Sequence, residues 1–244
     1  CLARNCRENR FESAAYALRN AATRALGLFK KNVPRYIAIS EFVKRRLTAA
    51  GFPEDRIDVL YNMIAIPDTP AGVGAGGYAA FTGRLSEEKG VDTLLAAAAR
   101  LPEIPVKIGG LGPIEARLKQ AAPPNVFFPG MFDATALAGF YRDAAFVVVP
   151  SVWHEAFGLV AAEAMSHGIP VIAARNGALP ELLADGAAGM LFTPGDPADL
   201  AEKMRLLWED PAPRRELGLA GPPRAQRLFS PAAHFEGLGG IFQR

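Results

Sequence analysis

Short apolar runs and longer helical segments alternate regularly along most of this chain, from about residue 78 onward. The apolar runs, which are bounded by Gly or Pro, predict buried strands at residues 78–82, 105–108, 126–128, 145–149, 170–173 and 189–192. The segments between them are rich in Ala and Leu and predict helices at residues 90–100, 113–121, 134–142, 157–167, 179–184 and 197–208. Strands and helices that alternate in this way predict an α/β fold with a doubly wound parallel sheet.

The rest of the chain follows a less regular pattern. Before the sheet, with Ser40 as an expected N-cap, we predict helices at residues 11–29 and 41–50 and strands at residues 34–39 and 57–61. A run rich in Pro and Gly at residues 67–77 predicts a linker between domains. Residues 213–228 look helical, but we expect their Gly and Pro residues to break the helix. The predicted parts are residues 1–66, a linker at 67–77, a main domain at 78–229 and a C-terminal helix at 230–244.

Composition limits the classes of protein that fit. Of the 244 residues, 50% are hydrophobic, which is enough for a substantial core. No apolar run reaches the roughly 18 residues of a spanning helix, and the N-terminus lacks the apolar segment of a signal peptide, so we expect a cytoplasmic protein. Cys1 and Cys6 are the only cysteines and have no His nearby, which disfavours a zinc site. No metal and no cofactor are expected.

Positive charge is concentrated near the N-terminus. Residues 1–46 carry 11 Lys and Arg against three Asp and Glu, whereas residues 47–244 carry 16 against 22, which gives +8 and −6. The predicted helix at residues 11–29 combines an apolar stripe with Arg and Lys. We expect the stripe to pack against protein, and peripheral contact with the inner face of a membrane is the alternative. No nucleic-acid partner is expected.

Two glutamates eight positions apart follow the predicted strand at residues 145–149. Glu155 falls in the turn after this strand, and Glu163 lies inside the next helix among Ala and Met residues. The start of that helix offers free N–H groups near Gly158, which favour a phosphate. A carboxylate among apolar neighbours needs hydrogen-bond donors, and ribose hydroxyls would supply them to Glu163. The alternative is that both are ordinary surface glutamates.

A second polar segment follows the first predicted strand of the sheet. Gly83 lets the backbone approach a ligand, and Arg84 and Lys89 bring two positive charges close together. Two such cations would offset the charge of a diphosphate and of a leaving nucleotide, and a solvated polar loop is the alternative. The Gly-rich turn at residues 109–113 lacks the third Gly of a dinucleotide fingerprint, where Glu115 stands, so hydride transfer is disfavoured.

Three further polar features have no evident chemistry. His154 and His167 lack an identifiable Ser, Cys or carboxylate partner, so we expect neither to act as a general acid. The turn at residues 176–181, with the sequence NGALPE, is expected to be structural.

The order of these motifs resembles the nucleotide-binding half of the retaining GT-B glycosyltransferases of family 4, within the glycosyl transferases group 1. The matching segments are GRLSEEKG, GGLGP, NVFFPG, VPSVWHEAFGLVAAEAMSHGIPVIA, NGALPELL and PGD, and the resemblance covers residues 33–235. It implies that the sheet is a Rossmann-like C-terminal donor-binding domain. Residues 1–66 would then be a remnant of the N-terminal acceptor-binding domain.

The resemblance also implies roles for individual residues. Arg84 and Lys89 would hold the diphosphate of a sugar nucleotide, and Glu155 would contact the transferred sugar; these three are the predicted catalytic residues. The ribose hydroxyls would bind Glu163. The other predicted donor-binding positions, of which Met131 would lie near the base, are Gly83, Met131, Phe157, Gly158 and Leu159.

The implied reaction moves a sugar from a UDP or GDP sugar to a hydroxyl of a saccharide or lipid-linked acceptor, with retention of the anomeric configuration. A non-catalytic nucleotide-sugar-binding subunit and a GT-B sugar-nucleotide epimerase are the alternatives. Ala156 and Ala178 replace Gly residues that are usual in the family, and their methyl groups would narrow the sugar pocket. Because most of an acceptor domain is absent before Tyr36, we expect the chain alone to bind donor without transferring the sugar.

Overall fold

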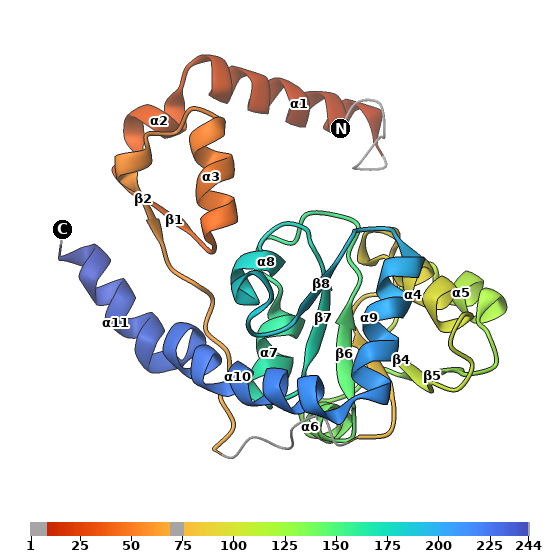
Figure 1. Ribbon diagram of the computed structural model, residues 1–244. Coiled ribbons are helices and arrows are strands. Elements are labelled where there is room, and N and C mark those ends of the chain that lie inside the picture. Colours follow the sequence, from red (N-terminus) through yellow and green to blue (C-terminus); the bar gives the residue numbers. More distant parts are fainter. Residues whose placement is uncertain (1–8, 69–75, 244) are drawn as a thin grey trace.

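Six parallel strands form the central sheet of the computed structural model, which describes residues 9–68 and 76–243 (Figure 1). Their order across the sheet is β5-β4-β3-β6-β7-β8. The strands are β3 (Ala79–Thr82), β4 (Val106–Gly109), β5 (Val126–Gly130), β6 (Phe146–Val149), β7 (Val171–Ala174) and β8 (Met190–Phe192). The sheet grows from β3 in one direction and from β6 in the other, which is the order of a doubly wound Rossmann-like fold. The predicted fold class is thereby confirmed.

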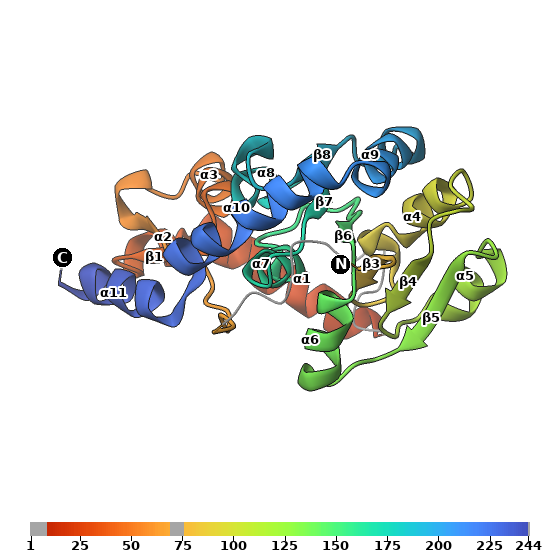
Figure 2. The same cartoon turned by 60° about the horizontal axis from the view of Figure 1, so that its bottom comes forward.

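Helices cover both faces of this sheet (Figure 2). One face is covered by α4 (Val91–Ala98), α5 (Glu115–Ala121) and α9 (Pro197–Glu209). The other is covered by α6 (Ala134–Arg142), α7 (Leu159–Ser166), α8 (Leu179–Leu182) and α10 (Pro211–Phe229). Single 3₁₀ turns lie at η1 (Glu54–Arg56), η2 (Glu87–Lys89) and η3 (Ala184–Gly186). The central strands β6 and β7 are therefore buried along their whole length, whereas the edge strand β5 leaves Phe127 exposed.

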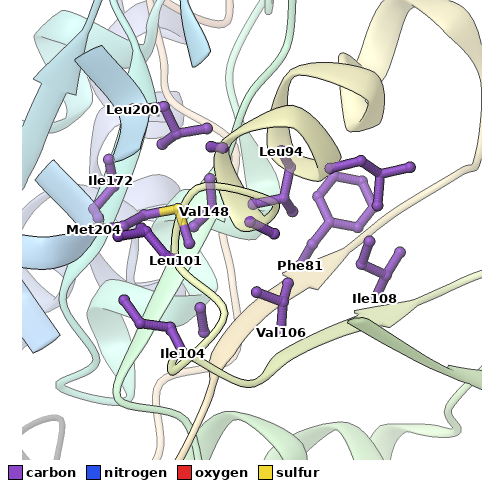
Figure 3. Close-up of a cluster of buried hydrophobic side chains, with 14 of the residues drawn as sticks. Phe81, Leu94, Leu101, Ile104, Val106, Ile108, Val148, Ile172, Leu200 and Met204 are labelled. Atoms are coloured by element: carbon purple, nitrogen blue, oxygen red, sulfur yellow. The ribbon is translucent and has the colours of Figure 1, made fainter. Parts of the chain in front are cut away.

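Side chains of the strands alternate between two hydrophobic cores, one on each face. In β6, Phe146 and Val148 belong to the core under α4 and α9. The residues that follow each of them, Val147 and Val149, belong to the opposite core. Figure 3 shows part of the first core, where Leu94 of α4 lies among side chains of the strands. Burial on both faces explains why the strands read as continuous apolar runs in the sequence.

The segment before the sheet forms a small β-α-β unit. β1 (Tyr36–Ala38) pairs in parallel with β2 (Ile57–Val59), and α3 (Glu41–Ala49) connects them. Ser40 is the N-cap of α3, as predicted, because its hydroxyl oxygen accepts a hydrogen bond from the Val43 N–H at 3.1 Å. The two strands have only three residues each and are shorter than predicted.

The predicted helix at residues 11–29 is interrupted in the structure. α1 (Arg10–Ala25) and α2 (Leu28–Asn32) are separated at Gly27, whose φ of 62° lies in the left-handed region that ends helices. Phe11 and Leu18 of the predicted apolar stripe are 88% and 72% exposed. The expectation that the stripe packs against protein is therefore wrong for these two side chains. None of the helices in residues 9–68 and 76–243 is long and apolar enough to cross a membrane.

α10 continues through Pro222 and Pro223, where the sequence predicts a break. The helix packs along α7 so closely that a Cβ atom on Gly221 would lie 2.7 Å from the Met165 carbonyl oxygen. Tertiary packing here outweighs the local cost of two prolines, so the predicted break is wrong.

The last helix returns to the segment that precedes the sheet. α11 (Pro231–Phe242) begins after Ser230, and its His234 Nδ1 lies 2.8 Å from the Tyr61 carbonyl oxygen. Residues 69–75 of the predicted linker, like Cys1 and Cys6, lie outside the described residues. In the part of the chain that the structure describes, no three His, Cys, Asp or Glu residues gather as metal ligands.

Candidate functional site

The candidate site lies between β3 and β6, where the two halves of the sheet diverge. The chain leaves β3 for α4 on one face and leaves β6 for α7 on the other. Such a switch point opens a crevice at the carboxyl ends of the strands. In this protein it is a cavity of about 400 Å³, lined among others by Gly83, Arg84, Lys89, Glu155, Phe157, Gly158 and Leu159. Seven of the nine predicted site residues therefore share one cavity.

Glu155 and Lys89 form an ion pair in this cavity. Lys89 Nζ lies 2.7 Å from Glu155 Oε1, and the Ser151 hydroxyl donates to the same oxygen at 2.6 Å. The side chain of Lys89 is 32% exposed and that of Glu155 is 18% exposed, so solvent reaches the pair. Among the described residues, none donates a hydrogen bond to Glu155 Oε2. One oxygen of this carboxylate can therefore accept a hydrogen bond from a ligand while the other keeps its protein partners.

The backbone of Glu155 is held by the turn that follows β7. The Ala178 N–H donates to the Glu155 carbonyl oxygen at 2.8 Å. Gly177 adopts a φ of 62°, and a Cβ atom there would lie 2.2 Å from the same carbonyl oxygen. Only glycine fits so close an approach. The turn at residues 176–181 thus has the structural role that the sequence predicts.

Arg84 presents the second positive charge at the end of β3. Its side chain is exposed and forms no hydrogen bond or ion pair with the described residues. The pKa of Glu88 is lowered chiefly by a hydrogen bond from Ser86, with smaller effects from the charges of Arg84 and Lys89. Arg84 can therefore bind an anion in the cavity without breaking an existing ion pair.

The first turn of α7 lines the cavity with its backbone. The first hydrogen bond within the helix runs from the Ala162 N–H to the Gly158 carbonyl at 3.1 Å, so the N–H groups of Leu159 and Val160 have no partner inside the helix. Gly158 precedes the helix with a φ of 104°. The helix dipole and these N–H groups favour an anion at this position.

Glu163 lies one turn further along α7 and is not part of the lining of the cavity. The Tyr141 hydroxyl donates to its Oε2 at 3.4 Å and lies 2.9 Å from Thr82 Oγ1, which does line the cavity. Burial raises the pKa of Glu163, and the hydrogen bond from Tyr141 opposes this effect. Glu163 is thus half-buried and is linked to the cavity through two hydroxyl groups.

A second cavity, of about 320 Å³, adjoins the first and contains Met131. It shares Thr82, Gly83 and Arg84 with the first cavity and is otherwise lined by the ends of β4 and β5 and by nearby apolar side chains. Met131 is 75% exposed. The ninth predicted residue therefore lies across Arg84 from the Glu155 pair, on the side of β4.

Sequence reasoning missed several residues of the site. Asn62 and Ile39 line the first cavity although both precede the predicted linker. Tyr141 was also missed, although a Tyr in the helix before the predicted strand at residues 145–149 was a possible signal. Nothing in the spacing of Asn62 and Ile39 marks them, because their place depends on how the β1–β2 unit packs against the sheet.

The two histidines, for which no role as a general acid is predicted, are not part of the lining of the cavity. His154 Nδ1 lies 2.5 Å from Asn176 Oδ1, and its ring packs against Phe42 with centroids 5.4 Å apart. His167 Nδ1 is buried without a hydrogen-bond partner among the described residues, and burial lowers the pKa of this side chain. Neither contacts the Glu155 carboxylate.

The fold and the place of the crevice define a Rossmann-like domain with a polar site at its topological switch point. The HepE protein of Anabaena, solved with UDP and glucose, aligns with a TM-score of 0.78 and 23% identity over 90% of this chain and 65% of its own. At that identity the likeness concerns the fold alone. Sucrose-phosphate synthase from Thermosynechococcus elongatus aligns with a TM-score of 0.74 and 29% identity, covering 85% of this chain and 57% of its own.

The chain belongs to the glycosyl transferases group 1 family, whose model matches residues 74–222. It is 37% identical over 159 residues to a D-inositol 3-phosphate glycosyltransferase of Arthrobacter sp. (strain FB24), which is 60% of this chain and 38% of that protein. It is 35% identical over 150 residues to the sulfoquinovosyl transferase SQD2 of Arabidopsis thaliana, which is 59% of this chain and 29% of that protein. The matches thus span less than two fifths of these relatives. Together with the family model, they confirm the predicted resemblance to the glycosyl transferases group 1.

Proposed function

We propose that this chain binds a nucleoside diphosphate sugar as the donor half of a retaining glycosyltransferase. The observation that carries the proposal is the cavity at the switch point, which is lined together by Arg84, Lys89, the Glu155 carboxylate and the first turn of α7. Membership of the glycosyl transferases group 1 family supports the transferase class. The names of the relatives from Arthrobacter and Arabidopsis, both glycosyl-transferring enzymes, support it as well.

The diphosphate binds between the two cations and the start of α7. Arg84 is unpaired among the described residues, and the N–H groups of Leu159 and Val160 are free of helical partners. When the ligand arrives, the Lys89 ammonium group binds the phosphate as well as Glu155, because a diphosphate has a higher charge density than one carboxylate. These groups together offset the charge of the diphosphate without calling on a metal ion.

The remaining parts of the donor bind on either side of Arg84. Glu155 Oε2 accepts a hydrogen bond from a hydroxyl of the transferred sugar. The ribose hydroxyls donate to Glu163, which requires the Tyr141 hydroxyl to share this carboxylate. The base occupies the cavity next to Met131, whose lining is mostly apolar. The nucleotide thus extends from the end of β6 toward the ends of β4 and β5.

In the transfer step, the bond between the anomeric carbon and the diphosphate oxygen breaks. A bond to the acceptor oxygen forms on the same face of the sugar, and the proton of the acceptor hydroxyl passes to the leaving phosphate oxygen. The chain stabilises the negative charge that develops on the leaving group through Arg84, Lys89 and the helix start. The acceptor is a saccharide or a lipid-linked acceptor, and the enzyme acts in the cytoplasm.

Calorimetric titration with UDP, GDP and their glucose and mannose conjugates tests this proposal. We expect at least one nucleoside diphosphate to bind, and Glu155→Gln to weaken only the intact sugar nucleotide. For retention, slow hydrolysis of an α-linked donor followed by proton NMR should first release the α-anomer. Binding of none of these ligands would contradict the proposed donor. A β-anomer as first product would contradict retention.

A further inference from the structure

The first turn of α3 is held by residues on the far side of the linker. The Glu181 carboxylate accepts hydrogen bonds from the backbone N–H groups of Glu41 and Phe42, each at 2.8 Å. The Ser40 hydroxyl, which caps the same helix, donates to the Ala156 carbonyl oxygen at 2.6 Å. The hydrogen bonds from Ser40 and from the start of α3 thus reach residues that lie more than one hundred positions later in the sequence.

Ser40 contacts Ala156, which is the neighbour of Glu155, the residue proposed to bind the sugar. Ala156 follows Glu155, and both of their carbonyl oxygens are hydrogen bonded: Glu155 by the Ala178 N–H at 2.8 Å and Ala156 by Ser40. Two successive peptide groups are thus fixed from two sides. One support comes from the turn after β7, and the other comes from the segment before the linker.

Glu181 is a half-buried part of this contact and is not an exposed surface charge. Its side chain is 16% exposed, and burial raises its pKa while the two backbone hydrogen bonds lower it. Arg224 of α10 donates to the carbonyl oxygens of Glu181 and Leu182 at 2.6 and 2.7 Å, which anchors α8 under the carboxylate. A carboxylate removed from water in this way is costly unless its oxygens are satisfied, and α3 satisfies both of them.

We infer that Ser40 and Glu181 are positioning residues that set Glu155 against the donor sugar, so that the segment before the linker takes part in sugar recognition. The inference rests on the proposed function. Ser40 and Glu181 do not touch the ligand. They act by holding α3 against the loop that carries Glu155. Loss of either contact allows that loop to move, which weakens the bond to the sugar and leaves the diphosphate contacts of Arg84 and Lys89 intact.

The test compares two ligands on the whole chain. UDP and GDP, and the sugar nucleotide of whichever binds, are titrated into the wild type, Ser40→Ala and Glu181→Gln. We expect the affinity for the sugar nucleotide to fall about threefold to tenfold in each variant, as for one lost hydrogen bond, and the affinity for the free diphosphate to change less than about twofold. Asp210→Ala is the matched control, because it removes the N-cap of α10, whose carboxylate accepts a hydrogen bond from the Ala212 N–H at 2.8 Å.

The outcomes separate this inference from the proposed function. A wild type that binds no nucleoside diphosphate overturns both. If the wild type binds and the variants lose affinity for both ligands equally, or for neither, only the positioning role is overturned. Melting temperatures identify a variant that fails to fold, and the other variant then decides, since the two substitutions act on opposite sides of the same contact. A lower affinity for the sugar nucleotide alone in the Asp210→Ala control would also contradict the inference, because the loss of any helix cap would then explain the effect.

Discussion

The six-stranded sheet and the β1–β2 unit before it are stabilised in different ways. The central strands β6 and β7 of the sheet are fully buried between two hydrophobic cores, whereas α3 has no buried residue. Of the described residues before the linker, Ile64 is the only buried member of either core. The unit instead relies on contacts with the helices that cover the sheet, such as the hydrogen bond from the Ile64 N–H to the Phe229 carbonyl oxygen of α10 at 2.9 Å. The difference shows that the sheet is stabilised mainly by buried apolar side chains, whereas the smaller unit is attached to it by hydrogen bonds and partly buried side chains.

Removal of a buried ring from the sheet should have the largest effect. Phe146 in β6 is fully buried, so Phe146→Ala should lower the free energy of unfolding by about 3–5 kcal/mol through lost burial and a cavity. Phe11→Ala in α1 is the matched control, because that ring is 88% exposed and should cost less than about 0.5 kcal/mol. Urea unfolding measures both. Similar losses in the two variants would contradict the contrast between the regions.

Substitution of the glycine beneath Glu155 should have a smaller, more local effect. Gly177→Ala places a Cβ atom 2.2 Å from the Glu155 carbonyl oxygen at a φ of 62°, which should cost about 1–3 kcal/mol or displace the loop. The affinity for the sugar nucleotide should fall with it. Gly239→Ala in α11 meets no atom within 4 Å and should be neutral or slightly stabilising. Unchanged stability and binding in Gly177→Ala would show that the loop tolerates the methyl group.

Glu163→Gln should raise the stability of the protein at pH 7 but weaken its binding of nucleotides. Burial raises the pKa of Glu163 above its ordinary value of 4.5, so the charged form is disfavoured in the folded state. Stability is therefore lost as the pH rises from about 4.5 through the raised pKa, and the neutral Gln variant should melt at a higher temperature than wild type at pH 7 but not below pH 4. Its affinity for nucleotides should fall about tenfold through the lost charged hydrogen bond.

The control for this prediction is Glu216→Gln on the exposed side of α10. Thermal melts across the pH range and titrations at pH 7 give both readouts. A Glu163→Gln protein that is less stable at pH 7, with unchanged nucleotide affinity, would contradict the account of this carboxylate.

The smallest effect is expected in the β1–β2 unit. Arg35 and Asp58 join its two strands through an ion pair of 2.7 Å, with side chains that are 35% and 13% exposed. Solvent screens such a pair, so Arg35→Gln should cost less than about 1 kcal/mol. Chemical unfolding at low and high salt measures the difference. A loss as large as that of Phe146→Ala would mean that this unit contributes far more to stability than its burial indicates.

The sequence pattern predicted the sheet because its strands are apolar on both faces and its helices have regular spacing. It also predicted Arg84, Lys89 and Glu155 at strand ends that the doubly wound order brings together. The place of Asn62 in the cavity and the hydrogen bond from Ser40 to Ala156 could not be predicted, since both depend on how the segment before residue 67 packs against the sheet domain. The pairing of Glu163 with Tyr141 likewise depends on how α6 and α7 lie side by side. α10 continues through Pro222 and Pro223, where the sequence predicts a break, because its packing on α7 outweighs the cost of the two prolines.

Titration of a nucleoside diphosphate into wild type and Arg84→Ala tests the central claim most directly. Arg84 is exposed and unpaired among the described residues, so its removal disturbs no hydrogen bond within them. The account predicts a loss of about 10- to 100-fold in affinity for the diphosphate, little change for the nucleoside, and no loss in Arg205→Ala on the exposed side of α9. Equal affinity of wild type and Arg84→Ala for the diphosphate would show that the cavity between β3 and β6 is not the donor site.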